Sequence, residues 1–315
     1  MVVFAYDLTA LKRIEQELAH QKAHLARVVN AMPDMVFLKD AEGVYLSVNP
    51  VFERFAGRPE RDVVGRNDYD LTNPAEAERF RQLGARADCV QVTGSIKFDL
   101  TIDAQLPVRA RALREAWQAL QRPVWIAAST HAGEDEIVLA AHRELLTQNP
   151  DALLILVPRH PERFNAVFEL CQRQGFNTRR RSTGEALLAS DQVLLGDTMG
   201  ELLFLYALAD TAFVGGSLVA NGGHNLLEPA ALGKPVLSGP HLFNFLEIAA
   251  QLRTAGALSE VADADGLAQR VAQLWREPAT AEAMRTAGQA VMRANQGALA
   301  RLLAGLARLL KVESP

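Results

Sequence analysis

Residues 123–134 read PVWIAASTHAGE and residues 153–161 read LLILVPRHP, and these two stretches decide the fold. Each begins with an unbroken apolar run, which is typical of a strand buried on both faces of a parallel sheet. Each run then ends in polar or turn-forming residues, and an amphipathic helical pattern follows. The pair therefore predicts consecutive units of strand, loop and helix.

The same alternation continues along the chain. We expect strands at residues 123–128, 153–157, 193–195, 211–214 and 235–237, helices at residues 134–146, 161–175, 199–208 and 227–232, and a string of helices from residue 244 to 310. Strands that alternate with helices favour an α/β fold with a right-handed, doubly wound, Rossmann-like parallel sheet. Ligands of such sheets bind outside the carboxyl ends of the strands, so we expect a functional site in the loops there.

The composition is that of a globular protein. The 315 residues are 49% hydrophobic and 22% charged, which excludes a disordered or fibrous chain. The formal net charge of −4 argues against a nucleic-acid-binding protein, and two cysteines are too few for a disulfide framework or a zinc site. No apolar stretch of the sequence has the length that a membrane span or a signal peptide requires, so we expect a cytoplasmic protein.

Polar and flexible residues follow the predicted strands. Ser129 and Thr130 follow the first strand and lead into a helix whose free N–H groups can hold an anion. Arg159 follows the second strand in a stiff, proline-flanked turn, and Gly215 and Gly216 follow the fourth. Each also has an ordinary explanation, since paired glycines often form only a tight turn and a lone arginine is often a solvated surface charge.

The segment NLLE at residues 225–228 carries the strongest of these signals. It opens a predicted helix directly after a glycine-rich loop, where main-chain N–H groups can receive a phosphate. A carboxylate one turn into the helix, here Glu228, can accept two hydrogen bonds from ribose hydroxyls. The alternative is that Glu228 only stabilises the helix dipole, an effect worth ~0.3–1 kcal/mol.

The N-terminal 75 residues have a different character. Apolar residues repeat with heptad spacing, which favours a short coiled coil and a homodimer through residues 7–32, although an amphipathic helix on its own domain also fits. Residues 35–39 and 44–48 flank a turn that contains glycine and predict two short strands. A helix is expected over residues 49–57, where a final glycine ends it.

The N-terminal motifs resemble a sensor family. The run PDMVFLKDAEGVYLSVNPVFERFAG, followed by VVGRNDYDL, resembles the first half of a PAS sensor domain, and DLTALKRIEQELAHQKAHL resembles the signalling helix that joins PAS domains. The elements that complete a PAS sheet are not recognisable after Leu71. We therefore expect a partial α+β PAS fragment without a bound flavin or haem.

The rest of the chain resembles a second family. VTGSIKFDL, AASTHAGEDE, LLILVPRHPERF, VLLGDTMGELLFLYALAD and FVGGSLVANGGHNLLEPAALGKPVLSGPHLFNF, in this order, resemble the C-terminal, nucleotide-binding half of bacterial 3-deoxy-D-manno-octulosonic acid (Kdo) transferases. The resemblance implies a GT-B glycosyltransferase of lipopolysaccharide biosynthesis that moves Kdo from CMP-Kdo to a lipid A precursor. It also implies that the transfer inverts the configuration at the anomeric carbon, that no metal ion or other cofactor is needed, and that the reaction takes place at the cytoplasmic face of the inner membrane.

The resemblance assigns a donor site to three segments. The residues that match the family's CMP contacts are Pro158 and Arg159, then Met199, Gly200 and Glu201, then Asn225, Leu226, Leu227 and Glu228. Lys97 matches a lysine that steadies charge in the transition state, which is reasonable because CMP leaves as an anion. Ser129, Thr130, Gly215 and Gly216 are weaker candidates for donor contacts.

The family's N-terminal Rossmann domain, which supplies the acceptor pocket and the general base, has no recognisable counterpart here. The domains we expect are a signalling or coiled-coil helix at residues 1–32, the PAS fragment at 33–75, a junction at 76–100 and a GT-B nucleotide-sugar-binding domain at 101–315. Because sugar transfer needs a base at the acceptor hydroxyl, we expect transfer to lipid A to be lost or very slow.

Two further expectations concern association. In the alternative interpretation, the N-terminal residues form a PAS-type sensory or dimerisation module, and the α/β region is a nucleotide-binding passenger. The Ala- and Leu-rich residues 283–310 predict an apolar stripe that stays uncovered and favours self-association.

Overall fold

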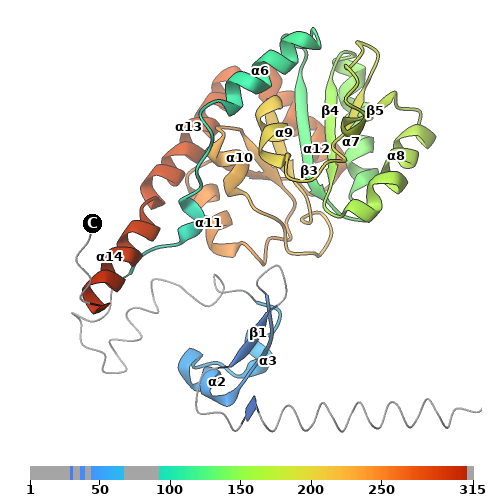
Figure 1. The fold of residues 1–315 in the computed structure, drawn as a ribbon. Helices are drawn as coiled ribbons and strands as arrows, with labels where there is room; N and C mark the ends of the chain where they lie inside the picture. Colours follow the sequence, from blue (N-terminus) through green and yellow to red (C-terminus); the bar gives the residue numbers. More distant parts are fainter. Residues whose placement is uncertain (1–28, 31–35, 40–43, 67–91, 311–315) are drawn as a thin grey trace, which may run out of the picture. The chain divides into compact units, whose positions relative to one another are not determined.

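The computed structural model describes residues 29–30, 36–39, 44–66 and 92–310 (Figure 1). The chain divides into two compact units, Met1–Glu76 and Ala77–Pro315. The predicted coiled coil and the turn before residue 44 lie almost wholly outside the described residues. In the part of the chain that is described, no helix is long and apolar enough to cross a membrane.

The described part of the first unit is a small α+β structure. Its elements are β1 (Phe37–Lys39), β2 (Tyr45–Val48), α2 (Pro50–Ala56) and α3 (Glu60–Val63), and β1 and β2 pair antiparallel. The two strands and the helix that follows them confirm the sequence prediction. The short α3 was not predicted.

Asn49 explains why α2 begins where it does. Its side-chain oxygen accepts the N–H of Phe52 at 3.0 Å and that of Val36 at 3.1 Å, so one residue caps the helix and ties it to the strand region. Gly57 ends the helix at φ 60°, the left-handed conformation that glycine adopts readily. The buried apolar side chains among the described residues of this unit are Tyr45, Val48, Phe52 and Val63.

The second unit is built on a seven-stranded parallel sheet in the order β5-β6-β4-β3-β7-β8-β9. The strands are β3 (Val124–Thr130), β4 (Leu153–Pro158), β5 (Thr178–Arg180), β6 (Val193–Leu195), β7 (Thr211–Val214), β8 (Val236–Ser238) and β9 (Leu258–Glu260). The helices are α6 (Leu106–Ala116), α7 (Asp135–Gln148), α8 (Phe164–Arg173), α9 (Leu202–Leu208), α10 (Leu227–Ala231), α11 (Leu246–Thr254), α12 (Ala264–Arg276), α13 (Pro278–Asn295) and α14 (Ala298–Leu310). Short 3-10 turns occur at Ile96–Phe98 (η2), Pro161–Arg163 (η3) and Arg181–Thr183 (η4).

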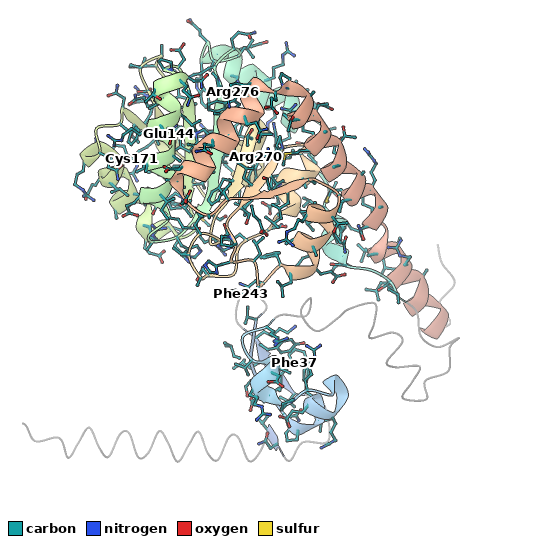
Figure 2. All side chains as sticks on the ribbon, turned by 180° about the vertical axis from the view of Figure 1, so that it is seen from behind. Phe37, Glu144, Cys171, Phe243, Arg270 and Arg276 are labelled. Atoms are coloured by element: carbon teal, nitrogen blue, oxygen red, sulfur yellow. The ribbon has the colours of Figure 1, made fainter. Side chains whose placement is uncertain are left out.

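Helices cover both faces of this sheet, which confirms the predicted doubly wound α/β fold. Along β3, Trp125 and Ala127 pack toward α7, α8 and α12, whereas Ile126 and Ala128 pack toward α6 and α9. Figure 2 views the first of these layers, with Cys171 labelled on α8. Because every residue of β3 is buried, the continuous apolar run that predicted it is explained by its central position.

The structure also corrects several predicted elements. The edge strands β5 and β9 and the helix α6 were missed, and β9 interrupts the region from residue 244 to 310 that was expected to hold only helices. The helix predicted over residues 161–175 begins as the 3-10 turn η3 before α8 takes over.

The C-terminal helices differ in burial. Helix α13 buries Met284 and Met292 against the core, whereas the described part of α14 exposes Leu299, Leu302 and Leu303. Asp99 holds the start of α14, because its carboxylate accepts the N–H groups of Gly297 and of Leu299, the latter at 2.6 Å. The apolar stripe expected in this region therefore lies on α14 and not on α13.

A buried histidine links α7 to the sheet. The indole N–H of Trp125 donates to Nδ1 of His142 at 3.2 Å, and Nε2 of His142 lies 2.9 Å from the carbonyl oxygen of Gln192. Because a carbonyl only accepts, Nε2 carries the hydrogen and the ring is neutral. Burial lowers the pKa of His142 to about 4, with a small opposing effect of the Gln192 hydrogen bond.

This histidine predicts a pH dependence of stability. Its pKa is lower in the folded than in the unfolded chain, so the unfolded state binds more protons between pH ~6.5 and ~4. The free energy of unfolding should fall by about 3 kcal/mol as the pH falls through that window. Urea unfolding followed by tryptophan fluorescence should show a smaller loss for His142→Gln. The control His241→Gln, which replaces an exposed histidine, should show the pH dependence of the wild type. If the free energy of unfolding of His142→Gln fell with pH as steeply as that of the wild type, the assignment to His142 would be contradicted.

Candidate functional site

The parallel strands bring the predicted site residues to one edge of the sheet. The loops that follow β6, β4, β3, β7 and β8 leave from neighbouring carboxyl ends, since these strands are adjacent in the sheet order. Pro158 is the last residue of β4 and pairs with Thr130 of β3. Arg159 follows directly, and its N–H donates to the carbonyl oxygen of Thr130 at 3.0 Å.

The centre of this edge is the fully buried carboxylate of Glu134. Its Oε2 accepts the main-chain N–H groups of His131 at 3.0 Å and Gly216 at 2.6 Å, and its Oε1 accepts those of Ser217 at 2.9 Å and Leu218 at 2.8 Å. A buried carboxylate without partners is costly, and four donors offset that cost. One side chain therefore joins the loop after β3 to the loop after β7.

This arrangement changes the interpretation of the two glycines after β7. The N–H of Gly215 donates to Ala128 at 2.8 Å and that of Gly216 donates to Glu134, so neither is available to a phosphate in this structure. A Cβ on Gly215 would lie 2.8 Å from the carbonyl oxygen of Ser129. The two glycines are therefore required for close packing of the two loops, and the weaker donor contact predicted at Gly215 and Gly216 stays a prediction.

The two hydroxyl residues at the end of β3 also have structural partners or constraints. Thr130 is fully buried, and its hydroxyl donates to Asp135 at 2.6 Å, while Arg163 donates to the same carboxylate. Burial raises the pKa of Asp135, and the Thr130 and Arg163 hydrogen bonds oppose that rise. Ser129 has φ 59°, a left-handed conformation that is uncommon outside glycine and marks a strained turn at the strand end. The Thr130 hydroxyl thus points inward, toward Asp135, and the donor contact predicted at Ser129 and Thr130 stays a prediction.

The segment at residues 225–228 is arranged around its two polar side chains. Asn225 accepts the N–H of Leu227 at 3.0 Å and donates to the Glu228 carboxylate at 3.2 Å. Burial raises the pKa of Glu228, and the Asn225 hydrogen bond opposes that rise. Leu226 and Leu227 are fully buried in the core, so only their main-chain atoms are placed to meet a ligand.

The loop between β6 and α9 carries the second predicted segment. Glu201 accepts hydrogen bonds from Thr198 at 2.6 Å and from Arg181 at 2.9 Å. Met199 is 67% exposed, and Gly200 has φ 79° with no other atom within 4 Å of a notional Cβ. This stretch of main chain is therefore open to solvent, as a contact with a nucleotide requires.

An aspartate fixes the start of that loop. Asp197 is buried and accepts hydrogen bonds from the Arg180 side chain at 2.6 Å and from both the N–H and the hydroxyl of Ser182. Burial alone would raise the pKa of Asp197, but these hydrogen bonds outweigh it and the pKa is lowered. Together with the Arg181–Glu201 pair, this contact joins the loop to the segment after β5.

Lys97 lies in η2 and contacts the loop that leads into α11. Its Nζ is 5.0 Å from the centre of the Phe245 ring, a cation–π contact. Phe245 packs against the core cluster that also contains Leu226 and Leu227. The lysine is thus held on the same side of the unit as the NLLE segment.

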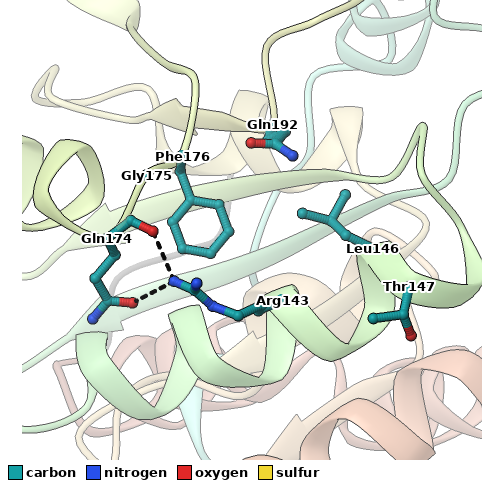
Figure 3. A pocket seen from close by; sticks show the side chains of 7 residues that line it. All are labelled: Arg143, Leu146, Thr147, Gln174, Gly175, Phe176 and Gln192. Carbon is teal, nitrogen blue, oxygen red and sulfur yellow. Dashed lines mark hydrogen bonds between the residues drawn. The ribbon is translucent and has the colours of Figure 1, made fainter.

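A shallow, open pocket lies elsewhere. About 270 Å³ in volume, it is lined by Arg143, Leu146, Thr147, Gln174, Gly175, Phe176 and Gln192 (Figure 3). Gln192 directly precedes β6, so the pocket is at the amino ends of the strands, and it contains none of the predicted site residues. Arg143 donates to the carbonyl oxygen of Gln174 at 2.8 Å inside it. In the described ranges, no three His, Cys, Asp or Glu side chains are grouped as a metal site.

Comparison with known families agrees with this architecture. The family model described as "Glycosyl transferases group 1" matches residues 121–291, and the model described as "PAS fold" matches residues 29–93. Since the first match spans more than half of the chain, the protein belongs to the group 1 glycosyl transferases. The prediction of a glycosyltransferase is confirmed.

Individual relatives indicate which glycosyl transferases the chain resembles. The chain is 48% identical over 227 residues to the 3-deoxy-D-manno-octulosonic acid transferase of Haemophilus influenzae, covering 72% of this chain and 53% of that protein. With the enzyme of the same name from Bordetella pertussis it is 38% identical over 294 residues, or 87% of this chain and 66% of that protein. The chain thus spans about half to two thirds of the length of these curated relatives, and the predicted resemblance to Kdo transferases is confirmed.

A solved structure gives the same answer. The C-terminal CMP-Kdo binding domain of WaaA from Acinetobacter baumannii is 40% identical to this chain and superposes with a TM-score of 0.58. The match covers 60% of this chain and 99% of that domain. The second unit is therefore a GT-B-type glycosyltransferase domain.

Sequence reasoning missed the residues that hold the loops in place. Glu134, Asp135 and Arg163 were not singled out, although Gly133-Glu134 at a predicted helix start was a signal for a residue that bonds main-chain N–H groups. Arg180 and Arg181 gave no local signal, because their partners lie 17 and 20 residues further along the chain.

Glu134 generates a prediction. In Glu134→Gln an amide nitrogen replaces one carboxylate oxygen, so two buried N–H groups lose their acceptor, and the free energy of unfolding should fall by about 3 kcal/mol. Urea unfolding followed by tryptophan fluorescence measures this, because all three tryptophans, Trp117, Trp125 and Trp275, lie in the second unit. Glu136→Gln, exposed in the same helical turn, is the matched control. Equal stability of the two variants would contradict the role of Glu134.

Proposed function

We propose that the second unit binds CMP-Kdo and that the chain is a Kdo transferase whose acceptor is a lipid A precursor. The observation that carries the proposal is that the three predicted donor segments, residues 158–159, 199–201 and 225–228, lie at or after the carboxyl ends of β4, β6 and β7 in a domain 40% identical to a CMP-Kdo binding domain. The names of the two transferases described above support the same sugar, and the name of the Acinetobacter baumannii domain supports the donor.

Each polar group has a definite task in this proposal. Arg159 pairs with the donor phosphate, since a guanidinium matches phosphate geometry and stays charged. Glu228 accepts hydrogen bonds from the ribose hydroxyls, and the main chain around Gly200 approaches the nucleotide. In the transfer, the bond between the anomeric carbon of Kdo and the phosphate oxygen breaks and CMP leaves as an anion. The acceptor hydroxyl forms the new glycosidic bond with inversion and gives its proton to a base.

Lys97 stabilises the charge that develops on the leaving phosphate. A fixed cation acts on the transition state more than on the ground state, which is where electrostatic catalysis is effective. The base that receives the acceptor proton is not among the residues assigned here. The acceptor lipid implies that the reaction takes place at the cytoplasmic face of the inner membrane.

A second function is favoured by the PAS-fold match at residues 29–93. In that alternative, the first unit is a sensory or dimerisation module and the second is a nucleotide-binding passenger. Transfer of Kdo from CMP-Kdo separates the two possibilities, because a nucleotide-binding passenger would bind the nucleotide without transferring the sugar.

The donor site predicts cytidine-nucleotide binding. CMP at about 100 times its dissociation constant should stabilise the second unit by ~2.7 kcal/mol and raise its melting temperature by roughly 5–10 °C. Arg159→Ala should weaken CMP binding at least tenfold in isothermal titration calorimetry, because a charged hydrogen bond is lost. The exposed Arg173→Ala serves as the control. No thermal response to CMP, with or without the substitution, would refute the proposed function.

The exposed leucines of α14 predict self-association of the chain. Leu299, Leu302 and Leu303 are 47%, 38% and 56% exposed and lie on one short stretch of helix. Light scattering should show a concentration-dependent dimer or larger species for the wild type. The double variant Leu302→Ser, Leu303→Ser should shift it toward the monomer. A wild-type chain that stays monomeric at high concentration would contradict this prediction.

A further inference from the structure

Two imidazole rings meet at the candidate donor site. Nε2 of His131, in the loop after β3, lies 2.7 Å from Nε2 of His224, which directly precedes Asn225. The ring planes differ by 8°, and the ring of His160 stands edge-on to His131 at a centroid distance of 5.3 Å. We call His131 and His224 the imidazole pair.

The imidazole pair is held in place from both sides. The N–H of His131 donates to Glu134, and Asn221 Nδ2 lies 2.9 Å from Nε2 of the same ring. A Cβ on Gly216 would come within 2.9 Å of the His224 ring, so the glycine leaves the space that this ring occupies. The N–H of Gly223 donates to the Gly216 carbonyl at 2.7 Å and fixes the chain just before His224.

The distance between Nε2 of His131 and Nε2 of His224 shows how many hydrogens lie between the two rings. A separation of 2.7 Å requires one hydrogen between them, so one ring donates through Nε2 and the other accepts. In the neutral pair the accepting ring carries its own hydrogen on Nδ1, whereas the donating ring has a bare Nδ1. One added proton therefore gives both Nδ1 atoms a hydrogen and the pair a positive charge, while the shared hydrogen bond stays intact.

The surrounding charges favour the neutral pair when no ligand is bound. Burial, together with the neighbouring His131, Arg159 and His160, lowers the pKa of His224 to about 3. Burial also lowers the pKa of His131, which the Glu134 carboxylate opposes and the cations of Arg159 and Arg163 reinforce. An anion beside Arg159 would cancel part of this positive field and raise both pKa values.

The main chain around the pair has few donors to offer a phosphate. The N–H groups of Gly216, Ser217 and Leu218 all point to Glu134, and that of Arg159 is bonded to Thr130. An anion beside the pair therefore needs side-chain partners. The side chains in the loops after β4, β3 and β7 include Arg159, His160, Asn221 and the imidazole pair.

We infer that the imidazole pair of His131 and His224 is a further contact for the phosphate of the donor nucleotide, and that it takes up a proton when the phosphate binds. This inference rests on the proposed function, because the ligand is the cytidine nucleotide. It adds a binding group that the donor segments do not include, and it links donor affinity to pH.

The test compares a ligand that carries a charged phosphate group with one that lacks this group. The methyl ester of CMP carries one negative charge that does not titrate near neutral pH, like the phosphodiester of the donor, and cytidine carries none. Calorimetry at pH 6 in buffers of different ionisation enthalpy gives the number of protons taken up. The full chain should take up a clear fraction of a proton with the ester and none with cytidine.

Variants test whether the proton taken up on binding goes to the imidazole pair. His224→Asn should abolish the uptake and weaken ester binding about tenfold, while leaving cytidine binding unchanged, since only a contact to the charged group is lost. The exposed His241→Asn should match the wild type. As a measurement that needs no variant, NMR spectra of chain labelled with ¹³C-histidine should show imidazole shifts moving toward the protonated form when the ester is added.

The outcomes separate the two claims. Binding of the ester without proton uptake and without histidine shift changes would overturn the inference and leave the proposed function standing. An equal loss of ester and cytidine binding in His224→Asn would also overturn it, since the ring would then have only a structural role. Failure of both ligands to bind the wild type would overturn the inference and the proposed function together.

Discussion

A single buried carboxylate organises the functional edge of this protein. Glu134 accepts four main-chain N–H groups from the loops after β3 and β7. Ser217, one of its donors, accepts the N–H of Gly239 on its hydroxyl at 2.8 Å and the N–H of His241 on its carbonyl at 3.0 Å. The loop after β8 is thereby joined to the other two, so the positions of three loops depend on one buried carboxylate and its four hydrogen bonds.

Arginine–carboxylate pairs extend the same principle to the neighbouring loops. Arg180 bonds Asp197, Arg181 bonds Glu201 and Arg163 bonds Asp135, and in each pair at least one partner is largely buried. Planar guanidinium groups hold carboxylates in a fixed geometry, which long flexible chains on the surface do not achieve. These pairs therefore fix the conformation of the loops around the candidate site before a ligand binds. Less conformational entropy is then lost on binding.

The sequence predicts the centre of the fold better than its margins, and the reason is burial. β3, β4, β6 and β7 are buried along their whole length, so their residues must be apolar and are recognisable as runs. β5 and β9 are the outermost strands of the sheet, and their sequences, TRR and LSE, are free to be polar because one side has no neighbouring strand. The site could be predicted as a set of loops, since parallel strands bring their carboxyl ends together. Which groups in those loops are already bonded could not, because Glu134 reaches Gly216 across 82 residues.

The hydrogen bonds of Glu134 determine which groups at the carboxyl ends of the strands remain available to a ligand. A glycine-rich loop after a strand is usually interpreted as an anion-binding loop with free main-chain N–H groups. Here the main-chain N–H groups of the loop after β7 donate to the carboxylate of Glu134 instead. Recognition of an anion beside this loop then depends more on side chains, whose charge and position vary with sequence. Asn225 holds Glu228, Arg181 holds Glu201, and the charge of Arg159 acts on the imidazole pair. In the donor site that we propose, a few fixed side chains select the ligand, and the affinity depends on the protonation of those that titrate.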